Sequence, residues 1–248
     1  GDGNAGAINI DTKTFDLTKG TSLTTETNSA GKAGNISINS EIVTIGEGAE
    51  ISATANENAT NTEAGGGNIS IFSNQVDISG KLGIFAQTQG KAPAGTLTLK
   101  TYNNAPDLDI NFSNDGFISA STTSTGNGGN IEISASETID ITGDGKISVE
   151  TTGAGDAGNI NIKTQDLKTS DKVSITASTT GDGNAGAINI DTKTFDLTKG
   201  TSLTTETNSA GKAGDISINS KTLKIGESAE LSARAKAGAT NTEAGGNI

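Results

Sequence analysis

The sequence repeats itself with a short and nearly constant step, and this step limits what the chain can fold into. A Gly-x-Ile-x-Ile motif begins at Gly34, Gly67 and Gly158. Related starts place the repeats, called rungs here, near residues 6, 34, 67, 95, 129, 158, 186 and 214, with a partial rung from 246. The commonest step is 28 residues, from 6 to 34 and from 186 to 214. A fixed period of this size is typical of solenoids, in which each repeat stacks on the one before.

Each rung carries three pairs of apolar residues, with one residue between the members of a pair. The pairs of the second rung are Ile36 and Ile38, Val43 and Ile45, and Ile51 and Ala53. Period-two alternation places both members of a pair on one face of a strand and the intervening residue on the other. Over eight rungs the intervening positions hold a single apolar residue, Phe85. We therefore predict an all-β chain: a right-handed parallel β-helix (β-solenoid) with three short strands per rung and about eight rungs.

The chain also contains a long internal duplication. Residues 1–34 recur unchanged as residues 181–214, and the similarity extends over 1–68 and 181–248. Because the rung pattern continues between the two copies, we predict one solenoid shaft over residues 1–248. A β-sandwich would also alternate apolar and polar residues, but it would not need equal pairs at a constant step.

Composition agrees with a thin, repetitive core. Of 248 residues, 34 are Gly and 6 are Phe, one is Tyr and none is Trp, which leaves little bulk for a globular interior. The net charge of −12 argues against nucleic acid or an anionic membrane surface as a partner. We also expect no membrane insertion, because no apolar run approaches the ~20 residues that span a bilayer.

An enzyme is not expected. The chain lacks His and Cys and has a single arginine, Arg234, so catalysis would rest on Asp and Glu. These acidic residues are spread over many rungs and do not gather beside aromatic residues. We predict no catalytic residue.

Asparagine often follows the glycine that opens a rung. We expect the side-chain amides of successive rungs to stack and hydrogen-bond along the axis, with a structural role. The predicted stack consists of Asn35, Asn68, Asn130, Asn159 and Asn247. Ala7, Thr96, Ala187 and Asp215 interrupt it.

A weak metal candidate lies on the outward side of the second strand of each rung. There the pattern places Asp77, Asp109 and Asp140 in one line, about 4.8 Å apart. Calcium favours clustered carboxylate oxygens. We expect these side chains to extend into solvent, with no cofactor bound, and calcium is the only ion that the line suggests.

The fourth rung is the least regular. It carries extra residues around Tyr102, Asn103 and Asn104 and again over 111–115. Insertions in solenoids often carry binding, so these three residues form a candidate binding bulge, and a plain surface bulge is the alternative.

Several motifs resemble those of one known family. They are the Gly-Asn-Ile-x-Ile start, the Ile-Ser-Ala-Ser third strand at 118–121 and the Gly-Asn-Ala-Gly link at 183–186. Over nearly the whole chain these resemble repeats of filamentous-haemagglutinin-like exoproteins of two-partner secretion, especially the cyanobacterial type. The resemblance implies a β-helical shaft that is exported unfolded across the outer membrane and folds outside the cell.

Fold and resemblance together predict a structural segment of a secreted, cell-surface adhesin or extracellular fibre. The alternative is a β-helical carbohydrate-binding or carbohydrate-active protein. The sequence starts at Gly1 and stops one strand into a ninth rung, at Ile248. As partners we therefore expect like repeats, covalently continued or stacked end to end, together with glycans or cell surfaces.

Overall fold

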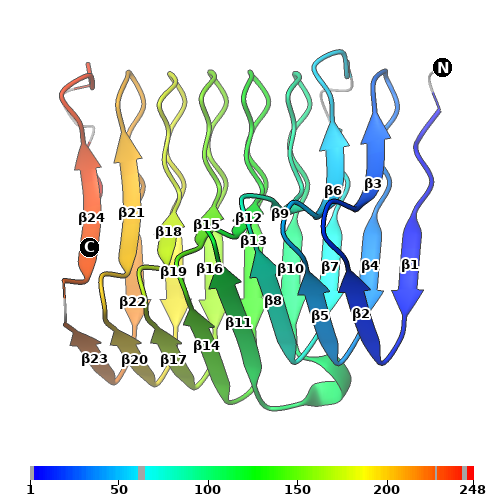
Figure 1. Cartoon of the computed structure of the whole chain (residues 1–248). Coiled ribbons are helices and arrows are strands. Elements are labelled where there is room, and N and C mark those ends of the chain that lie inside the picture. Colours follow the sequence, from blue (N-terminus) through cyan, green and yellow to red (C-terminus); the bar gives the residue numbers. More distant parts are fainter. Residues whose placement is uncertain (1–2, 61–64, 227, 242–244) are drawn as a thin grey trace.

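The chain forms a parallel β-solenoid, which confirms the predicted fold class. The computed structural model describes residues 3–60, 65–226, 228–241 and 245–248. Within these residues each of eight rungs gives one strand to each of three parallel sheets, and the rungs follow one another along a single axis (Figure 1). Neighbours in every sheet are therefore one rung apart in sequence.

The three sheets contain strands of three to six residues. The first sheet holds β1 (Ile8–Asp11), β4 (Ile36–Asn39), β7 (Ile69–Phe72), β10 (Leu97–Lys100), β13 (Ile131–Ser134), β16 (Ile160–Lys163), β19 (Ile188–Asp191) and β22 (Ile216–Asn219). The second holds β2 (Thr14–Leu17), β5 (Ile42–Ile45), β8 (Gln75–Ser79), β11 (Leu108–Ser113), β14 (Thr138–Thr142), β17 (Asp166–Thr169), β20 (Thr194–Leu197) and β23 (Thr222–Ile225). The third holds β3 (Ser22–Thr27), β6 (Glu50–Ala55), β9 (Gly83–Phe85), β12 (Phe117–Ser119), β15 (Lys146–Ser148), β18 (Ser174–Thr176), β21 (Ser202–Thr207) and β24 (Glu230–Ala235).

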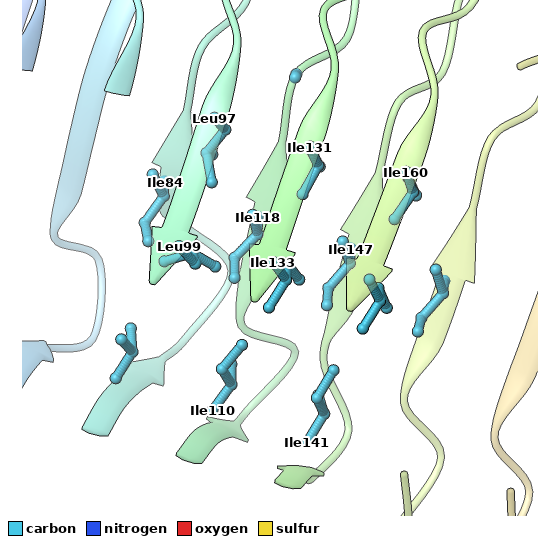
Figure 2. Close-up of a cluster of buried hydrophobic side chains, with 14 of the residues drawn as sticks. Ile84, Leu97, Leu99, Ile110, Ile118, Ile131, Ile133, Ile141, Ile147 and Ile160 are labelled. Carbon is cyan, nitrogen blue, oxygen red and sulfur yellow. The ribbon is translucent and has the colours of Figure 1, made fainter. Parts of the chain in front are cut away.

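The apolar pairs fill the interior, as predicted. Leu97 pairs in register with Ile131, and Ile131 with Ile160, so like positions form columns along the axis (Figure 2). These three side chains are fully buried. Ile and Val suit this arrangement because branched side chains pack well on a pleated surface. Burial of the columns is the main stabilising contribution that the rungs share.

Hydroxyl side chains extend the interior beyond the three predicted pairs. One column continues the third strands and joins Thr88, Thr122, Thr151 and Thr179 by single bridges, and each is at most 2% exposed. A second column, at the corner after the first strand, includes Ser40, whose Oγ donates to the carbonyl of Ile42 at 2.8 Å. A Ser or Thr hydroxyl can lie in such corners because it bonds to nearby main chain.

From the second rung onward, the glycine that opens the rung is required by close stacking. A Cβ atom on Gly34 would lie 1.9 Å from the carbonyl oxygen of Gly6, and one on Gly158 would lie 1.9 Å from that of Gly129. The same contact recurs from rung to rung, and neither backbone is left-handed there. The recurring Gly in the motif is therefore explained by the absence of a side chain.

The fourth rung changes the register of the second sheet. Strand β11 turns three residues inward, Leu108, Ile110 and Phe112. Towards β14, Leu108 and Ile110 meet the apolar pair of the next rung, but towards β8 it is Ile110 and Phe112 that meet Val76 and Ile78. The insertion over 111–115 is accommodated by this shift of two residues.

Glycines make room for the extra ring. A Cβ atom on Gly145 would lie 2.0 Å from Cγ of Phe112, and one on Gly116 would lie 2.9 Å from Cδ1 of the same ring. Phe112 is 5% exposed. The ring thus occupies space that the neighbouring rung leaves open, and the solenoid continues past the insertion.

Candidate functional site

The rung-opening asparagines bond along the axis, but not to each other's amides. Oδ1 of Asn35 accepts from the main-chain N–H of Asn68 at 2.9 Å, and Oδ1 of Asn68 accepts from the N–H of Thr96 at 2.8 Å. The same bonds run from Asn159 N–H to Asn130 and from Asn247 N–H to Asp215.

The prediction that the side-chain amides bond to one another is therefore wrong, because their oxygens accept from main-chain N–H groups of the next rung instead. The N–H at this corner needs an acceptor, and the side chain of the rung before supplies it. Ala187, which interrupts the column, still donates its N–H to Oδ1 of Asn159 at 2.8 Å. An interruption thus removes only the next bond, and the role of the column is structural.

A second column of the same kind lies three residues earlier, and sequence reasoning missed it. Oδ1 of Asn4 accepts from the N–H of Lys32 at 2.9 Å, and Asp156 accepts from the N–H of Asn184 at 2.6 Å. Asn127 and Asn184 accept in the same way from Asp156 and Lys212. The recurring Asn or Asp three residues before the predicted stack was the available signal.

The predicted line of three aspartates is not formed. Asp109 is the register partner of Asp140 on one side, as expected, but of Gln75 on the other. Asp77 lies opposite Asn111 because β11 is shifted by two residues. Its two carboxylate oxygens accept from the amides of Asn111 and Gln75, each at 2.7 Å. Both carboxylate oxygens of Asp77 are thus bonded to protein donors, whereas the sequence predicted that they extend into solvent.

Two carboxylates remain opposed on the second sheet. Burial raises the pKa of Asp109, and the charges of Asp140 and Asp107 raise it further. Burial also raises the pKa of Asp140, while Lys168 in the next rung acts in the opposite direction. Among the described residues no group of three or more Asp, Glu, His or Cys side chains is arranged to hold a metal ion.

The predicted binding bulge is a short 3-10 turn, Tyr102–Asn104. Asn103 and Asn104 have φ angles of 49° and 55°, a left-handed conformation that Asn adopts more readily than most residues. Both are exposed, whereas Tyr102 is half-buried and donates its N–H to Oδ1 of Asn74 at 2.9 Å. A shallow pocket of about 290 Å³ lies next to the turn, lined in part by Asp107 and Asp109. Binding at this bulge stays a prediction.

A compact ion-pair cluster lies on the outer face of the third sheet. Oε1 of Glu206 accepts from Nε of Arg234 at 2.7 Å, and Lys236 pairs with the other oxygen. Burial alone would raise the pKa of Glu206, but the bonds and charges of Lys236 and Arg234 hold it below its usual range. In the first copy of the duplication the same carboxylate, Glu26, meets the amide of Asn56 instead.

A further hollow lies on the outer face of the first sheet. It is a groove of about 480 Å³ that crosses β10, β13, β16, β19 and β22. Its polar lining includes Lys100, Glu132, Asn161, Lys163 and Asn189. Sequence reasoning missed it because residues between apolar pairs were interpreted only as outward-facing, and the hollow is formed by side chains from five neighbouring strands together.

Comparisons with known proteins give no relative: no protein-family model, curated protein or solved structure matches the chain. The filamentous-haemagglutinin-like family therefore stays a prediction from sequence motifs. Within the described part of the chain, no helix has the length and apolar character needed to cross a bilayer.

Proposed function

We propose that this chain is a structural repeat segment of a secreted, cell-surface adhesin or extracellular fibre, in which it acts as an extended shaft. The observation that supports this most is the unbroken stack of eight rungs in three sheets. At about 4.8 Å per rung, eight rungs extend the shaft by roughly 38 Å. A solenoid grows in length by adding rungs without changing its cross-section, which suits a spacer between a cell and what it touches.

The interactions that hold the shaft are spread evenly along it. Each rung is joined to the next by three parallel ladders and by the apolar columns, and most rungs are also joined by the Asn and Asp side-chain bonds. None of these requires a disulfide, and the chain has no cysteine. A chain that passes unfolded through an export pore and folds afterwards benefits from such local, repeated contacts, because each rung can add to the one already formed.

Like repeats are the proposed partners. Ile8 pairs with Ile36 in the first copy of the duplication, as Ile188 pairs with Ile216 in the second. The identical segments thus stack on the following rung in the same register at two places in the shaft. Further repeats of this type, in the same chain or in a neighbouring copy, can continue the stack by the same contacts.

Cell-surface labelling tests the proposal. Antibodies raised against the folded chain should label intact cells of the native organism, and mild external protease should remove the signal. An antibody against a cytoplasmic protein of the same cells serves as control for lysis. Labelling that appears only after permeabilisation would reject the extracellular shaft.

A further inference from the structure

The groove on the first sheet is long and spans several rungs. It follows the axis over five rungs, from β10 to β22, so its length is about four rung spacings, or roughly 19 Å. Ile133, Ile162 and Ile190 belong to its lining but are at most 2% exposed, because their side chains turn into the core. The side chains that face the groove are therefore those of polar residues, and their carbon atoms form much of its surface.

A ladder of side-chain hydrogen bonds runs through the middle of the groove. Nδ2 of Asn189 donates to Oδ1 of Asn161 at 2.8 Å, and Nδ2 of Asn161 donates to Oε1 of Glu132 at 2.7 Å. Each amide carries two N–H groups and two acceptor lone pairs, and in the described structure the ladder uses one N–H of each. The fixed side chains can present the remaining groups to a ligand with little further loss of conformational entropy.

Charge in the groove is balanced. Lys100 and Lys163 contribute two positive charges, and Glu132 and Asp191 contribute two negative ones. Nζ of Lys163 lies 3.7 Å from Oδ2 of Asp191. A polyanion would meet these carboxylates on a chain of net charge −12, and a polycation would meet the lysines, so the groove favours a neutral ligand.

The groove lacks what an extended peptide needs. Peptides that bind in extended form pair their main chain with a sheet edge and place side chains in pockets. Here the ligand would lie across the face of the sheet, where the strand edges are already paired on both sides. The lining residues with apolar side chains face inward, so they form no side-chain pocket.

We propose that this groove binds an extended chain of a neutral polysaccharide, lying parallel to the shaft axis. Sugar hydroxyls both donate and accept, which matches the amide and carboxylate groups of Asn161, Asn189 and Glu132. The rung spacing of about 4.8 Å is similar to the length of one pyranose unit in an extended chain, so successive sugars meet successive rungs. Phe72, half-buried and the register partner of Lys100, adds an apolar ring beside the first rung of the groove.

Binding of defined oligosaccharides to the folded chain tests the groove. Cellohexaose, xylohexaose and chitohexaose are titrated by calorimetry, with polygalacturonate as an anionic polymer and an extended Ser/Thr-rich peptide for comparison. The expected result is binding of at least one neutral hexasaccharide. The double variant Asn161→Ala with Asn189→Ala should weaken that binding by about tenfold or more.

The duplication supplies a matched control. Asn9 lies in the same local sequence as Asn189 but outside the groove, so Asn9→Ala should bind as wild type does. Ser134→Tyr, which fills the groove from an outward position, should also abolish binding, and circular dichroism verifies that each variant is folded. This second variant decides the matter if the double variant does not fold.

Three results would overturn the proposal: no binding of any neutral hexasaccharide by wild type, tighter binding of polygalacturonate or the peptide, or unchanged affinity in folded Ser134→Tyr. The shaft proposal is independent of these results, because surface labelling does not depend on the groove.

Discussion

Replacing Gly186 by alanine should push the rung that begins at Gly186 away from the rung that begins at Gly158. A Cβ atom at this position would lie 1.7 Å from the carbonyl oxygen of Gly158, whereas ordinary contact begins at 3.4 Å. The difference, 3.4 − 1.7 = 1.7 Å, is about a third of the ~4.8 Å between rungs. Relief of the clash would break at least two nearby bonds, Ala187 N–H to Asn159 and Ala157 N–H to Asn184.

The expected cost follows from these contacts. Overpacking costs about 1–3 kcal/mol and each lost hydrogen bond about 1 kcal/mol, which together give about 3–5 kcal/mol. For a chain of this size that corresponds to a fall in Tm of about 10 °C. Thermal and urea unfolding, followed by circular dichroism, measures the change.

Gly6→Ala is the matched control. Gly6 lies in an identical stretch of sequence, but a Cβ atom there would meet nothing within 4 Å. Effects on the unfolded chain are therefore the same in both variants and cancel in the comparison. If Gly186→Ala and Gly6→Ala unfolded at the same temperature, close stacking would not explain the recurring glycine.

Three further predictions concern single contacts. Gly145→Ala should destabilise the fold by about 1–3 kcal/mol because its Cβ would meet the Phe112 ring. In a double-mutant cycle, Phe112→Ala should remove that penalty. If the two substitutions were simply additive, the clash would not explain the loss of stability. Glu206→Gln should cost about 0.5–1 kcal/mol at pH 7, allowing for solvent screening, whereas Glu26→Gln should cost little. Since the pKa of Glu206 is lowered, the stability that its ion pairs contribute is present above about pH 4 and is lost as the pH falls through the folded-state pKa. A difference in stability between wild type and Glu206→Gln that did not change with pH would contradict the ion pairing. Asp109→Asn should raise stability at pH 7 because the folded-state pKa of Asp109 is raised, by no more than about 0.5 kcal/mol once solvent screening of this exposed side chain is allowed for. The gain should vanish below about pH 4, where the carboxyl is protonated in the folded and the unfolded state, and urea melts at pH 7 and pH 3 measure both effects.

The sequence predicts the three sheets because their signal is local and repeated. Ile36 and Ile38 alternate with polar residues, which predicts the face of the strand on which they lie. The same offsets recur in the next rung, which predicts the residues with which they pair. The buried hydroxyl columns were not predicted, since Thr151 and Ser40 are polar and lie outside the three apolar pairs of their rungs. Their burial depends on acceptors that the folded chain supplies: the main-chain carbonyl of Ile42 for Ser40 and the hydroxyl of Thr179, one rung away, for Thr151.

The register at the fourth rung could not be read from the pattern. Leu108, Ile110 and Phe112 alternate regularly, so either adjacent pair can align with the apolar pair of a neighbouring rung. In the structure Leu108 and Ile110 align with the next rung, whereas Ile110 and Phe112 align with the rung before. The Phe112 ring lies against Gly145. The predicted alignment of Asp77 with Asp109 failed for this reason. The groove was not predicted either, since side chains from five rungs form it together and no single motif specifies it.

Distances between labels on different rungs test the stacked shaft most directly. The protein has no cysteine, so Ser37→Cys and Ser217→Cys can carry two spin labels on the outer face of the first sheet. These positions lie in one column, six rungs apart by the register of the sheet. Electron–electron dipolar spectroscopy should give a narrow distribution near 29 Å, and Ser70→Cys with Ser217→Cys, five rungs apart, one near 24 Å, at about 4.8 Å per rung. Broad distributions, or a distance that does not shorten by one rung spacing between the two pairs, would contradict the account.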